Sequence, residues 1–106
     1  MKIVNTSPLR LEESQIIGLL ATIPHWDRQE QEIHRTFEFA DFKEAMNFVN
    51  RVATLAEKSA HHPNITICWN RVTFTLSTHS RGGLTQADFN LASQIDTIGD
   101  SKAPIK

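Results

Sequence analysis

The chain has 106 residues, of which 40% are hydrophobic and 22% charged, a composition typical of one globular domain. Its net charge of −1 provides no basic surface for nucleic acid, and its longest apolar run, residues 16–21, is far too short to cross a membrane. A single cysteine excludes an intramolecular disulfide. The length predicts a single domain over residues 1–106. Because the N-terminus lacks a signal-peptide pattern, we expect the protein in the cytoplasm.

The N-terminal part predicts a helix followed by a β-hairpin. Residues 11–22 carry apolar side chains at helical spacing and two glutamates in the first turn, and Pro24 prevents continuation of the helix. The side chains of residues 33–39 alternate in character, which is typical of a strand, and residues 26–32 are expected to form its hairpin partner. We expect Trp26 to pack in the core or on the sheet rather than to stack on a ligand.

Residues 41–59 give the strongest helix pattern. Apolar side chains such as Ala45 and Val49 repeat with a helical period along the whole segment. Asp41 suits the N-cap position, and Glu44 three residues later completes a capping box. A helix of this kind is expected to cover one face of a sheet.

Residues 64–78 predict a second hairpin, because two alternating strand patterns are separated by a turn at Asn70-Arg71. This arrangement places Trp69 among the side chains that pack on the sheet or in the core. It also places Cys68 inside a strand, where we expect a half-buried structural cysteine rather than a nucleophile.

A last helix is predicted to begin near Thr85, where Thr85 and Asp88 resemble a capping box, and to end at Gly99. The element order is therefore helix, strand, strand, helix, strand, strand, helix. This order predicts the α+β class, with a four-stranded antiparallel sheet and the helices packed on one face. The other face is then solvated or used for assembly.

Several polar side chains suited to acid–base chemistry gather at the ends of these elements. Glu57, His61 and His62 lie near the end of the long helix, His79 lies at the end of the last strand, and Asp88 lies in the first turn of the last helix. Side chains at neighbouring element ends can converge on one cleft. Two histidines in different protonation states can supply the acid and the base of one reaction.

Each of these residues also has a structural interpretation, and the pattern alone leaves both open. Adjacent histidines at a helix end can satisfy its last carbonyls, and His79 suits a structural role at a strand end. Glu57 suits a solvated helix surface, and Asp88 suits a cap. A zinc site has the right ligand types, but neighbouring histidines point apart and no paired spacing supports a metal cage, so no metal is expected.

The same residues resemble the signature of the pterin-4a-carbinolamine dehydratase family. Residues 57–63, Glu-Lys-Ser-Ala-His-His-Pro, are followed at the family's spacings by Trp69, His79 and Asp88. The resemblance extends over residues 9–98, and segments 37–42, 51–53, 75–79 and 83–85 are also similar to family segments. It implies the α+β fold predicted above and the dehydration of 4a-hydroxytetrahydrobiopterin to quinonoid dihydropterin, which recycles the pterin of aromatic amino acid hydroxylases.

The resemblance also implies a role for each residue of the signature. His61 and His79 would be the acid–base pair, and His62 would bind and orient the pterin ring. Glu57 and Asp88 would orient or tune these histidines.

Backbone groups near Ser77 and Thr78 are expected to bind the amide edge of the pterin, which is the substrate, so no cofactor is implied. The family further implies self-association as homodimers or homotetramers. A non-catalytic binding, dimerisation or assembly factor on the same fold is the alternative function. The chain departs from the family pattern at Asn64, where an acidic residue is usual, and at Arg10, so that residues 5–7 are expected to cap the first helix.

Overall fold

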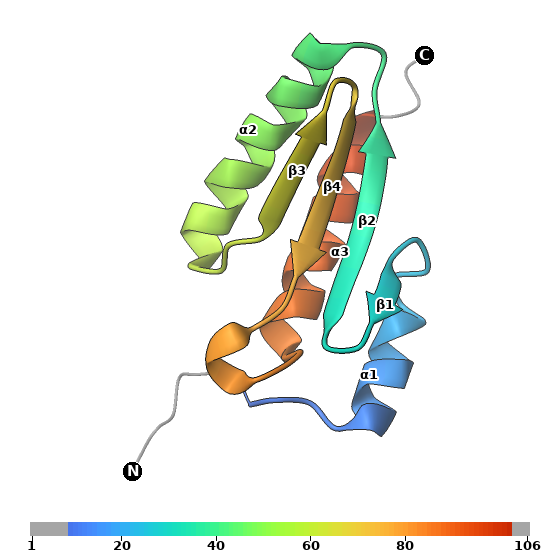
Figure 1. Ribbon diagram of the computed structural model, residues 1–106, viewed down its shortest axis with the longest axis vertical. Helices are drawn as coiled ribbons and strands as arrows, with labels where there is room; N and C mark the ends of the chain where they lie inside the picture. The colour runs from blue at the N-terminus through green and yellow to red at the C-terminus, as the bar shows by residue number, and fades with distance from the viewer. Residues whose placement is uncertain (1–8, 103–106) are drawn as a thin grey trace.

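The computed structural model describes residues 9–102 of the chain. Its elements follow the predicted order with one additional 3₁₀ turn, η1, as labelled in Figure 1. No helix within these residues has both the length and the apolar character needed to cross a membrane. The elements are α1 (Glu13–Leu20), β1 (Asp27–Gln29), β2 (Glu32–Glu38), α2 (Phe42–Ser59), β3 (Asn64–Cys68), β4 (Arg71–Leu76), η1 (His79–Arg81) and α3 (Gln86–Lys102).

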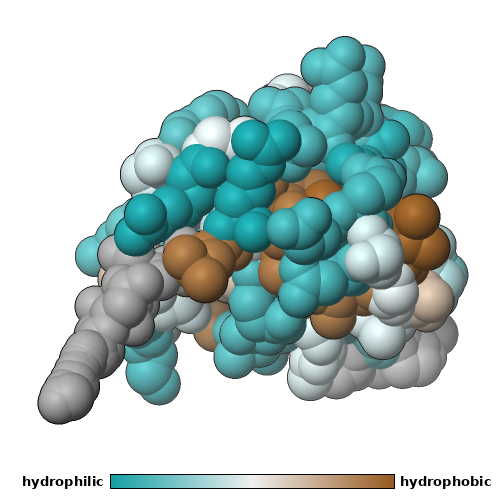
Figure 2. All heavy atoms as spheres, turned by 90° about the horizontal axis from the view of Figure 1, so that it is seen from below, coloured by the Kyte–Doolittle hydropathy of each residue, from teal (hydrophilic) through white to brown (hydrophobic). Residues whose placement is uncertain are grey.

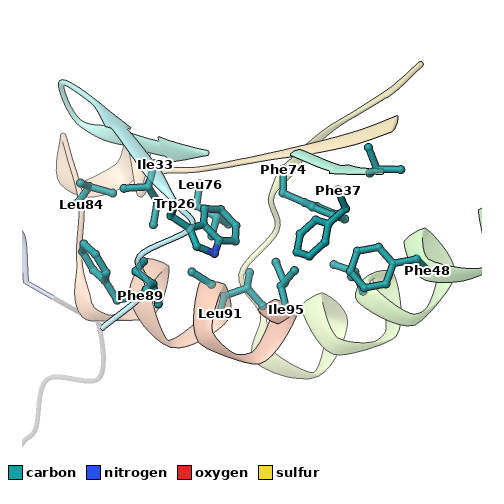
Figure 3. Packing of buried hydrophobic residues seen from close by; sticks show 14 of the residues in the cluster. Trp26, Ile33, Phe37, Phe48, Phe74, Leu76, Leu84, Phe89, Leu91 and Ile95 are labelled. Atoms are coloured by element: carbon teal, nitrogen blue, oxygen red, sulfur yellow. The ribbon is translucent and has the colours of Figure 1, made fainter. Parts of the chain in front are cut away.

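The four strands form one antiparallel sheet in the order β1-β2-β4-β3. In Figure 1 the sheet lies in front of α3, and Figure 3 shows α2 and α3 on the same side of the sheet. The predicted α+β class, with a four-stranded antiparallel sheet and helices on one face, is therefore confirmed.

The core fills the space between the sheet and the helices because apolar side chains alternate along the central strands. Val72, Phe74 and Leu76 of β4 are fully buried, and Ile33 of β2 pairs with Leu76 and is buried on the same face. The ring of Phe48 from α2 packs edge-on against Phe74, with centroids 5.6 Å apart (Figure 3). The apolar side chains of the strands and those of α2 therefore pack in one layer, and the sheet face that carries them is the face that the helices cover.

Asp96 of α3 joins the beginning of β1 to β2 beneath the sheet. Trp26 is only 4% exposed, as predicted, and its indole Nε1 donates to Asp96 Oδ1 at 2.8 Å. Arg35 donates to the same oxygen at 2.6 Å, and its guanidinium lies 4.0 Å from the centroid of the Phe37 ring. Arg35 is thus a charged residue on the core face of β2 whose charge is matched by a carboxylate.

Polar contacts hold α1 at its start and against β1. The backbone N–H of Glu12 donates to the side chain of Gln15 at 2.8 Å, while the cap expected at residues 5–7 lies outside the described residues. Arg28 of β1 donates to Glu13 of α1 at 2.6 Å, and this hydrogen bond lowers the pKa of the Glu13 carboxyl below its usual value. Because both partners lie near the surface, this pair positions α1 more than it stabilises the fold.

The start of α2 agrees with the sequence, because the Asp41 carboxylate accepts a hydrogen bond from the backbone N–H of Glu44 at 2.8 Å. At the other end of α2, Ala60 adopts the left-handed conformation with φ of 54°. This residue turns the chain away from the helix axis and towards β3.

The turn between β3 and β4 lies one residue earlier than predicted. Cys68 pairs with Arg71 in the ladder, so the two turn residues are Trp69 and Asn70 rather than Asn70-Arg71. Trp69 has φ of 54° and is 67% exposed, so the prediction that it packs on the sheet or in the core is wrong. The buried Asn70 side chain instead donates to the Phe39 carbonyl at 2.9 Å, a contact between the hairpin and the end of β2 that the sequence pattern does not reveal.

The uncovered face of the sheet is polar. Thr36 and Thr73 face each other across β2 and β4, with their hydroxyl oxygens 2.7 Å apart. Within the described residues β3 pairs with β4 alone, and its Cys68 is exposed. The predicted half-buried position of Cys68 is therefore wrong, because an edge strand has a neighbour on one side only.

Gly99 does not end α3, which continues to Lys102. Gly99 instead lies against the Phe37 ring, where a Cβ atom would be 2.5 Å from Phe37 Cε2. The prediction was wrong because a glycine near the end of a helical pattern marks either a C-cap or a close approach between elements. Here the missing side chain lets α3 pass directly over a core ring.

Replacing Gly99 with alanine therefore tests the packing of α3 on the sheet. We expect Gly99→Ala to lower the free energy of unfolding by about 1–2 kcal/mol, because the steric cost of the added methyl group exceeds its gain in helix propensity. Gly18→Ala in α1 is the matched control, since a Cβ there meets nothing within 4 Å, and it should stabilise the protein by about 0.5–1 kcal/mol. Urea unfolding curves measure both, and equal shifts for the two variants would contradict the packing argument.

Candidate active site

The residues of the predicted site lie at the end of the sheet where β4 leaves it and α2 ends. After β4, the backbone N–H of Thr78 donates to the Gly83 carbonyl at 3.2 Å, and that of Gly83 donates back to Thr78 at 3.3 Å. This small loop contains η1 and closes through Gly82 in the left-handed conformation, with φ of 75°. Figure 2 views this end of the molecule and shows a mostly hydrophilic surface with apolar side chains visible in its gaps.

Asp88, in the first turn of α3, is the buried anchor of the site and is fully inaccessible to solvent. Its Oδ2 accepts hydrogen bonds from the Thr78 hydroxyl at 2.8 Å and from the backbone N–H of Thr85 at 2.9 Å. Its Oδ1 lies 2.6 Å from Nε2 of His61. Asp88 therefore caps α3, as one interpretation of the sequence predicts, and also binds His61, as the other predicts.

The contact with Asp88 defines what His61 can do. The His61 side chain is 16% exposed, and its Nε2 faces Oδ1 of Asp88, whose other carboxylate oxygen accepts two hydrogen bonds. Nε2 therefore carries the proton in this pair, and Nδ1 is the nitrogen that remains available. A histidine that is oriented by a buried carboxylate has the arrangement used for proton transfer in many active sites.

His62 forms a similar but exposed pair with Glu57. Its Nε2 lies 2.7 Å from Glu57 Oε2, and the two side chains are 61% and 77% exposed. Such a pair is largely solvated, so it fixes the ring less firmly than Asp88 fixes His61. Glu57 thus lies beside one of the histidines, as predicted, and its partner is His62.

His79 differs from His61 and His62 because its side chain has no hydrogen-bond partner among the described residues. It begins η1, three residues beyond the last residue of β4, rather than ending the strand as predicted. The difference arises because the chain leaves the sheet at Leu76 to form the Thr78–Gly83 loop. Neither ring nitrogen of His79 has a hydrogen-bond partner among residues 9–102, so both are available to a ligand.

Two neighbouring cavities, which share Glu32, Ser77 and His79 in their lining, open at this end of the sheet. The larger, here the hairpin cavity, has a volume of about 480 Å³, which suits a small-molecule ligand. The smaller, here the histidine cavity, has a volume of about 20 Å³ and contains both His62 and His79. Residues lining the hairpin cavity are Gln29, Glu30, Gln31, Glu32, Ser77, His79, Gly82 and Gly83, and those lining the histidine cavity are Glu32, His62, Asn64, Thr75, Ser77 and His79.

The cavities bring together only part of the predicted site. His62, His79 and Ser77 line them, whereas His61 lines neither and reaches the site from its contact with Asp88. The side chain of Thr78 also lines neither, because it is buried against Asp88. Within the described part of the chain, no group of three or more histidine, cysteine or acidic side chains is placed to hold a metal ion.

The sequence interpretation missed the β1–β2 hairpin as a boundary of the site. Four consecutive residues, 29–32, line the hairpin cavity, and the loop residues Gly82 and Gly83 lie opposite them. The Gln31 side chain accepts a hydrogen bond from the backbone N–H of Leu84 at 3.1 Å, which fastens the hairpin to this loop. The sequence shows that residue 32 is polar and belongs to the alternating strand pattern. The neighbouring sequence does not show that residue 32 lies near residue 77, because that depends on which strands pair.

The chain matches the family model described as pterin 4 alpha carbinolamine dehydratase over residues 9–98. A protein of Thermomicrobium roseum named "Putative pterin-4-alpha-carbinolamine dehydratase" is 51% identical over 86 residues, which cover 81% of this chain and 92% of that protein. A protein of the same name from Roseiflexus sp. strain RS-1 is 49% identical over 89 residues, covering 84% of this chain and 96% of its own length.

Solved structures agree with this assignment. The crystal structure of a transcriptional coactivator/pterin dehydratase from Brucella melitensis is similar with a TM-score of 0.81 at 37% identity, covering 85% of this chain and 98% of that one. A pterin dehydratase-like protein described as a RuBisCO assembly factor in the alpha-carboxysome has a TM-score of 0.58 at 23% identity, covering 70% and 86%. The second likeness shows the fold alone.

The two carboxylate–histidine pairs predict different losses of stability. Asp88→Asn should lower the free energy of unfolding by about 1–3 kcal/mol. The amide replaces one carboxylate oxygen, which accepts a hydrogen bond, with an NH₂ group, which would face another donor. Glu57→Gln is the matched control, since its pair with His62 is exposed, and it should cost less than about 1 kcal/mol. Urea unfolding measures both changes, and an Asp88→Asn effect as small as that of Glu57→Gln would contradict the anchoring role.

Proposed function

The chain belongs to the pterin 4 alpha carbinolamine dehydratase family, and we propose that it removes water from 4a-hydroxytetrahydrobiopterin to give quinonoid dihydropterin. The observation that carries this proposal is His79, which has no hydrogen-bond partner within the described residues and lines a polar cavity of ligand size, beside a second histidine and near a third that a buried carboxylate orients. This is an arrangement for moving protons to and from a bound small molecule.

The chemistry requires one proton donor and one proton acceptor. The hydroxyl group on C4a leaves as water after it accepts a proton, while N5 loses its proton and forms the double bond to C4a. No electrons are transferred to or from the protein, so the pterin needs no additional cofactor. Each proton transfer by a positioned side chain contributes roughly 10²–10⁴-fold to the rate.

His61 and His79 are proposed as the acid–base pair, and His62 as a pterin-binding residue. In this proposal Asp88 keeps His61 in one tautomer, so that Nδ1 remains free to exchange a proton with the substrate. His79 offers either nitrogen, because it has no partner of its own within the described residues. The backbone of Ser77, which lines both cavities, is the proposed partner for the amide edge of the pterin.

A non-catalytic binding or assembly role on the same fold is the alternative function. His79 favours the enzyme, because it lines a polar cavity of ligand size without a hydrogen-bond partner among the described residues, and a scaffold has no structural need for such a residue. We also propose that the protein works in the cytoplasm as a homodimer or homotetramer. Light scattering on the purified protein measures the oligomeric state.

Alanine substitutions of the three histidines test the assignment of roles. His61→Ala and His79→Ala should each lower kcat for 4a-carbinolamine dehydration by roughly 10²–10⁴-fold, because each removes one proton-transfer group. His62→Ala should mainly raise KM. His25→Ala is the control, because His25 is exposed, lines neither cavity and should leave both constants unchanged.

Circular dichroism spectra of all four variants establish that each one folds. If His62→Ala lowers kcat more than His61→Ala does, then His62 and not His61 pairs with His79. If the unmodified protein does not accelerate the dehydration at all, the non-catalytic function replaces the enzyme.

A further inference from the structure

Glu32 lies where the two cavities of the candidate site meet. It is the first residue of β2 and pairs with Gln29 of β1. Because Ile33 points into the core, strand alternation directs Glu32 to the uncovered face of the sheet. Its side chain lines both the hairpin cavity and the histidine cavity, as His79 and Ser77 also do.

The carboxylate of Glu32 has no protein partner among the described residues, although the residue is half-buried. The two signature carboxylates are bound, since Asp88 contacts His61 and Glu57 contacts His62, and Glu30, the other acidic residue that lines the hairpin cavity, is exposed to solvent. A carboxylate that lines a cavity and has no protein partner there is available to a ligand that carries hydrogen-bond donors.

The position of Glu32 is held by contacts on both sides. The hairpin that leads into it is fastened to the opposite loop by the hydrogen bond from Leu84 to Gln31. Gly83 packs so closely there that a Cβ atom would lie 2.4 Å from Gln31 Oε1. The backbone at Glu32 is therefore held in place beside the cavity, and less entropy is lost when the residue binds a ligand.

A pterin ring presents the matching group. Its N3–H and its 2-amino group are two adjacent donors that point the same way, and a carboxylate accepts such a pair through both oxygens. In the same ring, only C4 separates N3 from C4a, the carbon that loses its hydroxyl group. A ring bound by Glu32 through this edge thus has its reacting carbon close to the acid–base groups that share the cavity.

We propose that Glu32 recognises the 2-amino and N3–H edge of the pterin and so positions the ring for dehydration. This inference rests on the proposed function and adds a residue to it. Glu32 acts as a positioning residue, because it binds a part of the substrate that does not react.

The experiment measures binding and turnover separately. Dissociation constants of 7,8-dihydrobiopterin and of its 2-deamino analogue are measured by calorimetric titration, and KM and kcat are measured for 4a-carbinolamine dehydration. Glu32→Gln keeps the size of the side chain but replaces one acceptor by a donor. Glu38→Gln is the matched control, because Glu38 lies on the same strand and the same face, at the far end from the cavities.

We expect the unmodified protein to bind the pterin roughly 10- to 100-fold more tightly than the deamino analogue, and Glu32→Gln to lose most of that preference. KM should rise by a similar factor in Glu32→Gln while kcat changes much less, and Glu38→Gln should resemble the unmodified protein. A purely structural role would weaken both ligands equally.

The outcomes separate this inference from the proposed function. An active protein whose Glu32→Gln variant keeps the full preference for the 2-amino group overturns the role of Glu32 and leaves the enzyme intact. An inactive protein that binds the pterin with a preference dependent on Glu32 overturns the enzyme and supports the recognition. A protein that binds neither ligand overturns both.

Discussion

The carboxylate of Asp88 is the contact on which the candidate site depends. It is fully buried, and it binds the end of α2 through His61, the segment after β4 through Thr78 and the start of α3 through Thr85. A buried charge is tolerated only when hydrogen bonds satisfy it, so the three segments must meet at this point for the fold to form. The same requirement that stabilises the junction also fixes the imidazole of His61.

Much of the fold could be predicted because its signals are local and agree with one another. The helical repeat of α2, its cap at Asp41 and the alternation along β4 each specify an element within a few residues. The errors occur where a residue has a role set by a distant partner. Gly99 is required by Phe37, and Asn70 is held by Phe39, and neither partner is visible from the surrounding sequence.

The candidate site was predictable to a similar degree. Histidines and carboxylates at the ends of α2, β4 and α3 were expected to converge, and they do so in part: Asp88 contacts His61, and His62 and His79 line one cavity. The contribution of the β1–β2 hairpin was not predictable, since it follows from the sheet order, which places β2 beside β4. Pairing of Ile33 with Leu76 then brings residue 32 next to residue 77.

The site thus combines residues that are held by hydrogen bonds to each other with residues that have no hydrogen-bond partner among the described residues. His61 and Asp88 are already bound to each other, so they gain little from a ligand and lose little freedom when one arrives. His79 and Glu32 have no partners within the described residues, so a ligand in the hairpin cavity would supply the hydrogen bonds that they lack. A pterin carries donors along one edge and a hydroxyl group and an N–H near its centre, and it is therefore chemically matched to both residues. Preorganisation on one side and unmet hydrogen bonds on the other favour binding in a single orientation, which is what directed proton transfer requires.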